Sequence, residues 1–159
     1  MIYVAVGTQK FPFDRLLKSI DELVANGTIL EDIFAQSGNC TYVPKNYLSK
    51  NFLSKDQFEE NIEKCDLLIT HSGVATMILG LKHKKPVIVI PRLAKYGEHV
   101  DDHQVQIAEV FAERNLVLKC CETDDLGELI AEAKSHLFSE YVSQKEEMIH
   151  TIREYINSI

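Results

Sequence analysis

The stretch LLITHSGVATMILGLKHKKPVIVI, residues 67–90, decides the fold of this 159-residue chain. Its first four and last four residues form short apolar runs, which are typical of buried strands. Between them, His71-Ser72-Gly73 is a turn signal and residues 74–81 are predicted to form a helix. The basic run 82–85 favours the end of that helix through the helix dipole, and Pro86 ends the unit. A strand, a helix and a second strand in this order predict a right-handed crossover between parallel strands.

The same alternation continues on both sides of this stretch. Further strands are expected at residues 2–6, 33–36, near 51–53 and at 116–118, and further helices at 16–24, from Ser54 onward, at 103–114 and at about 123–137. A last helix is expected over residues 139–159, with an apolar face of Val142, Ile149, Ile152, Ile156 and Ile159. The pattern predicts a single α/β domain over residues 1–159 with a parallel sheet.

The composition limits the classes of function. Hydrophobic residues make up 45% and charged residues 26% of the chain, which excludes a disordered, collagenous or coiled-coil protein. The formal charge is −7, from 17 basic and 24 acidic residues, so no nucleic-acid partner is expected. No apolar run approaches the ~20 residues that a membrane-spanning helix needs, and the N-terminus resembles a strand and not a signal peptide.

The cysteines predict no disulfide framework. The four cysteines stand at positions 40, 65, 120 and 121, and no two of them have the CxxC spacing. Adjacent Cys120 and Cys121 have poor geometry for a simple bridge. We therefore expect free thiols in a reducing cytoplasm.

Polar loops follow several of the expected strands. In an open parallel sheet, ligands bind beyond the carboxyl ends of the strands. Loops rich in Gly, Ser, Thr, His or Gln occur there, and their amides and hydroxyls suit a phosphate or diphosphate; they are Gly7-Thr8-Gln9, Gln36-Ser37-Gly38, His71-Ser72-Gly73 and residues 91–104. The sequence contains neither GxGxxG nor GxxxxGK[ST], so the Rossmann dinucleotide and P-loop signatures are missing.

The loop PRLAKYGEHVDDHQ, residues 91–104, is the most unusual of these segments. It carries two histidines, three carboxylates and one arginine, without the apolar spacing of a core element. A polar loop of this length in a compact domain is more often functional than a solvated connection. His99 and His103 are four residues apart, but a zinc site requires a third ligand and supporting partners. The sequence therefore predicts no metal.

Four segments together resemble the C-terminal-domain family of the family-28 glycosyltransferases. They are residues 6–16, Gln36-Ser37-Gly38, residues 70–73 and residues 86–104. The run EHVDDHQ, residues 98–104, is the most specific of them. Within the family, the chain is most similar to the small bacterial capsule and exopolysaccharide subfamily. That subfamily resembles the donor-binding subunit of the eukaryotic two-protein N-acetylglucosaminyl transferase that extends dolichol-linked sugar.

The resemblance implies half of a GT-B enzyme, a Rossmann-like domain that binds a UDP-sugar without a metal and without a cofactor. Gly7, Thr8 and Gln9 would face the diphosphate, Gln36 and Gly38 would line the donor cleft, and Phe52 and Leu53 would flank the uracil. The phosphates and ribose would lie against His71, Ser72, Gly73, Val74, Ala75 and Thr76. The sugar hydroxyls would meet Glu98, Asp102, His103 and Gln104, with Arg92 in the same loop. His71, Glu98 and His99 are candidates for the general base, which the partner could also supply.

Each of these positions also has a structural interpretation. His71 could be a turn histidine, Gln36 could tie two loops together and Phe52 could belong to the core. Arg92 could pair with Glu98 or Asp101. Many relatives carry an acidic residue, suited to holding the ribose hydroxyls, where this chain has Leu79, so the ribose contacts must come from elsewhere or be weaker.

The resulting prediction is an inverting glycosyltransferase subunit of polysaccharide biosynthesis. A GT-B enzyme needs two such domains and 159 residues supply one. The acceptor half would be a membrane-associated protein that binds a lipid-linked sugar and docks on the C-terminal helix. The complex would lie at the cytoplasmic face of the inner membrane. A non-catalytic accessory subunit and an unrelated nucleotide-binding regulator remain the alternatives.

Overall fold

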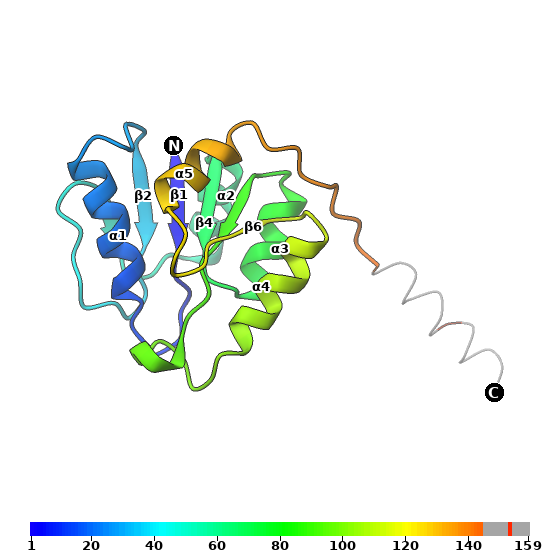
Figure 1. Ribbon diagram of the computed structural model, residues 1–159, viewed down its shortest axis with the longest axis horizontal. Helices are drawn as coiled ribbons and strands as arrows, with labels where there is room; N and C mark the ends of the chain where they lie inside the picture. The colour runs from blue at the N-terminus through cyan, green and yellow to red at the C-terminus, as the bar shows by residue number, and fades with distance from the viewer. Residues whose placement is uncertain (145–152, 154–159) are drawn as a thin grey trace.

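The computed structural model describes residues 1–144 and 153 and contains a six-stranded parallel sheet (Figure 1). The strands are β1 (Ile2–Ala5), β2 (Ile33–Gln36), β3 (Leu48–Lys50), β4 (Leu67–Thr70), β5 (Val87–Val89) and β6 (Leu118–Lys119). The helices are α1 (Asp14–Ala25), α2 (Lys55–Lys64), α3 (Val74–Lys82), α4 (His103–Glu113) and α5 (Leu126–Ala133), with a short 3-10 turn at Ala94–Tyr96.

The strand order is β3-β2-β1-β4-β5-β6. The chain moves outward from β1 in one direction through β2 and β3, and then returns to pair β4 with the other side of β1. The order therefore reverses between β1 and β4. Ligands of open α/β sheets bind at the carboxyl ends of the strands next to such a reversal.

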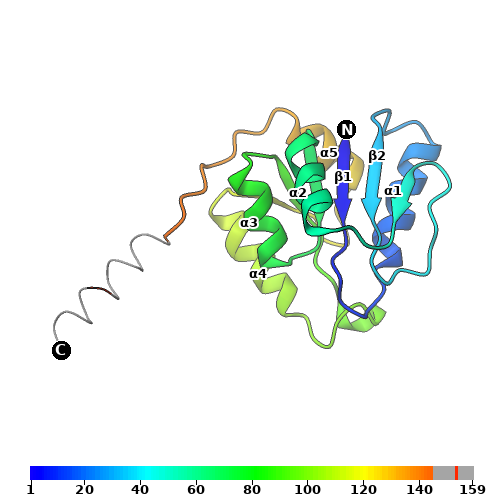
Figure 2. The same ribbon diagram turned by 180° about the vertical axis from the view of Figure 1, so that it is seen from behind.

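Helices cover both faces of the sheet, as the two views show (Figures 1 and 2). On one face, α1 and α5 pack against Val4, Ile69 and Ile88. On the other face, α2, α3 and α4 pack against residues such as Tyr3 and Leu68. Because both faces are covered, the central strands are apolar on both sides, which is the pattern that the sequence shows at 67–70 and 87–90.

The helix starts differ in a way that matters for function. Ser54 and Gln57 form a reciprocal capping box at the start of α2, and the Asp125 carboxylate accepts from the Glu128 amide at the start of α5. Gly73 begins α3 with no side-chain cap, and Asp102 begins α4 without one. The first amides of α3 are therefore available to other partners, whereas the His103 amide at the start of α4 donates to the Asp101 carboxylate at 3.1 Å.

The main elements agree with the sequence prediction, and the corrections lie at the edges. Strands β2 and β4 have the predicted bounds, whereas β3 lies at Leu48–Lys50 and not near 51–53. The side chains of β3 are exposed or half-buried at the edge of the sheet, so no apolar run marks it. The helix expected to reach about residue 137 ends at Ala133, and Asn115 holds the following chain by donating to the Leu137 carbonyl at 2.7 Å.

The predicted C-terminal helix is mostly beyond what the structure describes. Residues 139–144 are not helical, and Val142 is exposed. Ile149, Ile152, Ile156 and Ile159 lie outside the described residues. All four cysteines are free thiols, as predicted. Among the residues described, no helix is both long and apolar enough to cross a membrane.

Candidate donor site

The loops after β1, β4 and β5 meet at the carboxyl edge of the sheet, next to the reversal of strand order. Gly7 lies in the loop after β1 with a φ of 85°, a left-handed conformation that favours glycine. A Cβ atom at Gly38, in the loop after β2, would lie 2.3 Å from the Gly7 carbonyl oxygen. The chain therefore requires glycine at both positions so that the two loops can approach so closely.

The His71 ring fills the space between two glycines. A Cβ atom would lie 2.7 Å from the ring at Gly7 and 2.3 Å from it at Gly73. Thr70 Oγ1 donates to the Ala5 carbonyl at 2.7 Å, which leaves this hydroxyl oxygen to accept from His71 Nδ1 at 3.3 Å. This network assigns the ring proton to Nδ1 and leaves a lone pair on Nε2.

His71 is neutral at physiological pH. Burial, and to a smaller extent the charge of Arg92, lowers the pKa of His71 from 6.5 to about 4. A neutral imidazole with a free lone pair can accept a proton or a hydrogen bond. Its low pKa makes it a weak base, however, so the geometry suits a hydrogen-bond acceptor better than a strong general base.

The start of α3 offers a site for an anion beside this ring. Val74 and Ala75 are exposed, and Thr76 is half-buried. The Ser72 side chain is 1% exposed, and its hydroxyl has no hydrogen-bond partner among the described residues. A buried hydroxyl without a partner costs free energy unless a ligand supplies one. Uncapped helix amides and an unpartnered hydroxyl together suit a phosphate group.

The two glutamines of the predicted site hold the loops to each other. Gln36 Nε2 donates to the Asn51 carbonyl at 2.7 Å and to the Gly7 carbonyl at 3.3 Å. Gln104 Oε1 accepts from the Arg92 amide at 3.1 Å and from the Ser72 amide at 3.3 Å. Gln36 therefore has the loop-tying role that the sequence left open, and Gln104 connects the loops after β4 and β5.

Arg92 and Glu98 also support the walls of the site. The buried Arg92 guanidinium donates to four carbonyl oxygens, those of Val6, Phe11, Glu98 and Pro12, at 2.5, 2.8, 3.1 and 3.5 Å. The Glu98 carboxylate accepts from Nε and Nη2 of Arg15, both at 2.9 Å. Of the two partners considered for Arg92 from the sequence, Glu98 and Asp101, Arg92 therefore bonds Glu98, but through the backbone carbonyl, since Arg15 takes the carboxylate.

The remaining predicted residues lie at the rim of the carboxyl edge. Thr8 and Gln9 are exposed, and Asn39 donates to both of their carbonyls. Phe52 is 48% exposed, so its interpretation as a core residue is wrong, whereas Leu53 is half-buried against the core. The half-buried Leu79 also packs against that core.

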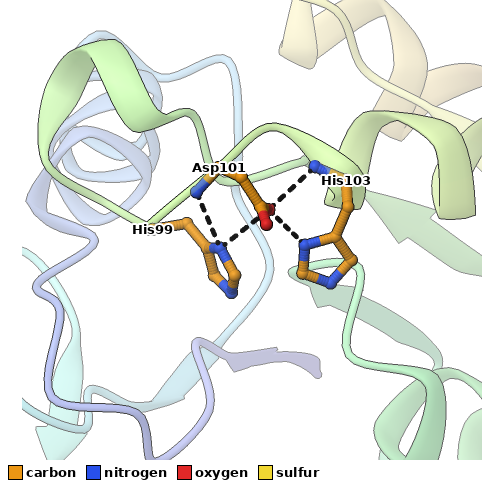
Figure 3. A group of neighbouring side chains, drawn as sticks. All are labelled: His99, Asp101 and His103. Carbon is orange, nitrogen blue, oxygen red and sulfur yellow. Dashed lines mark hydrogen bonds and ion pairs between the residues drawn. The ribbon is translucent and has the colours of Figure 1, made fainter.

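The long loop after β5 brings the other polar side chains to the start of α4 (Figure 3). The Asp102 carboxylate accepts from the Ala94 amide at 2.8 Å. His103 is exposed as the first residue of α4, and its ring contacts the buried His99 ring edge-on, with 4.7 Å between centroids.

Sequence reasoning gave no role to Arg15, Asn39 or Asn51, although all three hold the site together. Arg15 and Asn39 lie within or beside the segments that carry the family resemblance. The partners of Arg15 and Asn39 are 30 or more residues away along the chain, and Gln36, a partner of Asn51, is 15 residues away, so no local pattern reveals the contacts. A separate cavity of about 580 Å³ lies near the amino end of β5, lined by Leu81, Pro86 and Tyr141 among others.

Comparison with solved structures identifies the fold. The fold is similar to that of the glycosyltransferase of kitacinnamycin, with a TM-score of 0.62 and 17% identity over 85% of this chain and 35% of that one. It is also similar to the NMR solution structure of ALG13, with a TM-score of 0.57 and 21% identity over 94% and 93% of the two chains. The fold is thus the Rossmann-like α/β domain found in GT-B glycosyltransferases.

Sequence comparison gives the family. The model of the glycosyltransferase family 28 C-terminal domain matches residues 1–159, and the chain belongs to this family. The chain is 28% identical over 133 residues to the UDP-N-acetylglucosamine transferase subunit ALG13 of Homo sapiens, and 28% identical over 130 residues to that of Mus musculus. These matches cover 75% and 74% of this chain, but it spans only 11% and 10% of the two relatives.

Proposed function

We propose that this chain binds the UDP-sugar donor of a glycosyltransferase at the carboxyl edge of its sheet, without a metal ion. One observation carries the proposal: the uncapped start of α3 and the buried, unpartnered hydroxyl of Ser72 lie beside the Gly7 turn at the reversal of strand order. The diphosphate lies against these groups. Uncharged amides and a hydroxyl stabilise phosphate oxygens directly, so no cation is needed to bridge them.

The positions of the uracil, the ribose and the sugar are assigned from the exposed residues at the same edge of the sheet. The uracil lies by Phe52 and Leu53, where an exposed ring borders the half-buried wall. The phosphates and ribose extend along Val74, Ala75 and Thr76. The sugar reaches Asp102 and His103, which are exposed at the start of α4. Gln36, Arg92, Glu98 and Gln104 keep the loops in this arrangement through the hydrogen bonds described above.

The proposed reaction is the inverting transfer of a hexose to a lipid-linked acceptor in capsule or exopolysaccharide synthesis. The naming of the mammalian relatives as transferase subunits supports a heteromer. In it, a membrane-associated partner carries the acceptor and holds this chain at the cytoplasmic face of the inner membrane. Inversion needs a base on the acceptor hydroxyl. Among His71, Glu98 and His99, Arg15 already holds the Glu98 carboxylate, burial weakens His71 as a base and His99 is itself buried. This arrangement favours a base from the partner.

The partner docks on the C-terminal segment in this proposal. The apolar positions of that segment, apart from the exposed Val142, lie outside the described residues, so the argument rests on their spacing in the sequence. Truncation after Tyr141 is expected to leave a folded domain that binds UDP but no longer co-purifies with the partner. An unfolded product would assign the segment to the core of the domain, and retained co-purification would move the docking surface elsewhere.

Calorimetric titration of the isolated chain tests donor binding. UDP and a panel of UDP-sugars are expected to bind, ADP to bind more weakly, and treatment with EDTA to leave the affinity for UDP unchanged. Equal affinity for ADP and UDP would favour a nucleotide-binding regulator. The word subunit in the relatives' names also favours a second candidate, a non-catalytic accessory protein, and the absence of any donor binding with or without the partner would select it.

A further inference from the structure

Three side chains of the loop between β5 and α4 converge on one point (Figure 3). His99, Asp101 and His103 each offer a nitrogen or carboxylate oxygen atom, and these atoms all lie within 4.8 Å of one another. Within residues 1–144 and 153, this is the one group of three His, Cys, Asp or Glu side chains with such spacing. The sequence pointed to His99 and His103 but gave no third ligand.

The distances suit a small cation. His99 Nδ1 lies 3.3 Å from Asp101 Oδ1, and His103 Nδ1 contacts the same oxygen from the other side. Zinc bonds to nitrogen and oxygen at about 2.0–2.2 Å, so two ligand atoms of a tetrahedral site lie about 3.4 Å apart. The His99–Asp101 pair already has this separation. The exposed His103 has to move its ring nitrogen outward by about 1 Å, which a surface rotamer permits.

The ligands are partly held in place before any ion binds. His99 is buried, and its ring packs near Phe11 with 6.0 Å between centroids. The Asp101 carboxylate accepts from the His103 amide at 3.1 Å, which fixes it at the start of α4. A site with ordered ligands loses less conformational entropy when the ion arrives.

The Asp101 carboxylate faces His99 Nδ1. Asp101 Oδ1 lies 3.3 Å from this nitrogen, and either a proton on Nδ1 or a metal ion between the two atoms makes the contact favourable. The Asp101 amide also approaches Nδ1, at 3.4 Å, and this long contact is given up when the nitrogen lone pair binds an ion.

We propose that His99, Asp101 and His103 form a binding site for a divalent transition-metal ion of the zinc class. Two imidazole nitrogens and one carboxylate oxygen are a donor set for zinc, cobalt or nickel, whereas magnesium requires oxygen ligands. Water completes the coordination on the exposed side. Both rings bind through Nδ1, so the ion fixes the proton of His103 on Nε2, away from the metal and free to donate. The ion thereby holds the loop that ends at the start of α4.

Metal titration tests this site in full-length protein purified without a histidine tag and stripped with EDTA. Calorimetry is expected to show one Zn²⁺ per chain and no binding of Mg²⁺, and Co²⁺ is expected to give the visible absorption of a nitrogen-ligated ion. Loss of a residue that only supports a metal ligand costs ~10-fold or more in metal affinity. The variants H103A and D101N each lose a ligand, so their Zn²⁺ affinity is expected to fall by at least this factor. Zn²⁺ is also expected to raise the Tm of the wild type but not of H103A.

The variant H83A is the matched control. His83 lies beyond the end of α3 and pairs with Glu59 at 3.6 Å, so its removal is expected to leave the Zn²⁺ affinity unchanged. Because His103 and Asp101 are exposed, their variants are expected to fold, which circular dichroism verifies. Equal Zn²⁺ affinity in the wild type and H103A, or no binding by either, overturns the site. UDP titration of the stripped protein tests the proposed function separately, since neither result depends on the other.

Discussion

The turn after β4 and the loop after β5 build the same edge of the sheet by opposite means. Three residues, His71-Ser72-Gly73, connect β4 to α3, and two of them are buried polar side chains. The connection from β5 to α4 covers residues 90–102 and is held by ion pairs and side-chain hydrogen bonds. The short turn brings backbone amides to the candidate site, and the long loop brings side chains of varied chemistry.

The two segments are not independent. Gln104 accepts from the Ser72 amide of the turn and from the Arg92 amide of the loop. Arg92 reaches further, to the loop after β1. The position of the long loop is therefore coupled to that of the turn at the proposed phosphate site. Four predictions separate what the turn does from what the loop does, and they follow in order of expected size.

The largest effect concerns the buried turn. The pKa of His71 falls from 6.5 to about 4 on folding, so its neutral form stabilises the protein above pH 6.5. As the pH falls from 6.5 to 4, the unfolded chain binds this proton first, and about 3 kcal/mol of stability is lost. Urea unfolding at pH 7 and pH 4.5 measures the difference. In His71→Gln, the free energy of unfolding is expected to depend less on pH in this range. An identical pH dependence in both proteins would show that His71 is not its source.

The second prediction concerns the long loop. Glu98→Gln removes the charge that binds Arg15 and keeps the shape of the side chain. Glu98 is buried but about a third of the Arg15 side chain is exposed, so we expect a loss of about 2 kcal/mol in unfolding free energy. Denaturant unfolding measures it, with Glu60→Gln at an exposed i,i+4 pair as the control, where a change below about 0.5 kcal/mol is expected. Similar losses of unfolding free energy at both positions would show that the ion pair of Glu98 with Arg15 does not hold the long loop in place.

A third test places a charge in the turn. Ser72→Asp puts a carboxylate beside the start of α3, where it opposes the phosphates and removes a hydroxyl donor. We expect UDP affinity to fall by roughly 2 kcal/mol, which is about 30-fold in Kd. Ser72→Ala tests the hydroxyl alone and is expected to cost about 1 kcal/mol. Unchanged UDP affinity in Ser72→Asp would remove the diphosphate from this turn.

The smallest effect separates sugar from nucleotide. His103→Ala is expected to weaken UDP-sugar by about 1 kcal/mol, the value of one partly exposed hydrogen bond, and to leave UDP unchanged. Gln104→Ala is the contrasting variant, because Gln104 connects the two segments and its loss is expected to weaken both ligands. Calorimetry with the two ligands distinguishes these patterns. Equal losses for UDP and UDP-sugar in His103→Ala would place His103 in the nucleotide site.

Most of the fold could be predicted because the strands are buried on both faces. Continuous apolar runs such as 67–70 and 87–90 follow from that burial, and the turn and capping residues between them mark the helices. The edge strand β3 could not be located from the sequence, because its side chains are exposed or half-buried and form no apolar run. The end of α5 was misplaced because a long-range contact from Asn115, and no local stop signal, holds the chain that follows.

The loops of the candidate site could be predicted, but the roles of several side chains could not. Sequence identifies Gln36, Arg92 and Glu98 as polar residues of ligand-facing loops. In the structure all three bind other parts of the protein, with partners between 5 and 86 residues away. A polar side chain at a strand end can face a ligand or a neighbouring loop, and only the positions of the other loops distinguish the two.

The sequence by itself determined the alternating α/β architecture, because periodicity and turn residues are local properties of the chain. Its resemblance to the family-28 C-terminal domain indicated the family and the loops that are proposed to bind the donor. Tertiary structure decided that His71 is a neutral ring between two glycines, that Arg15 holds Glu98 and that Asp101 joins two histidines in a candidate metal site. Burial, pKa and ligand geometry arise where distant segments pack together, so no local pattern contains them.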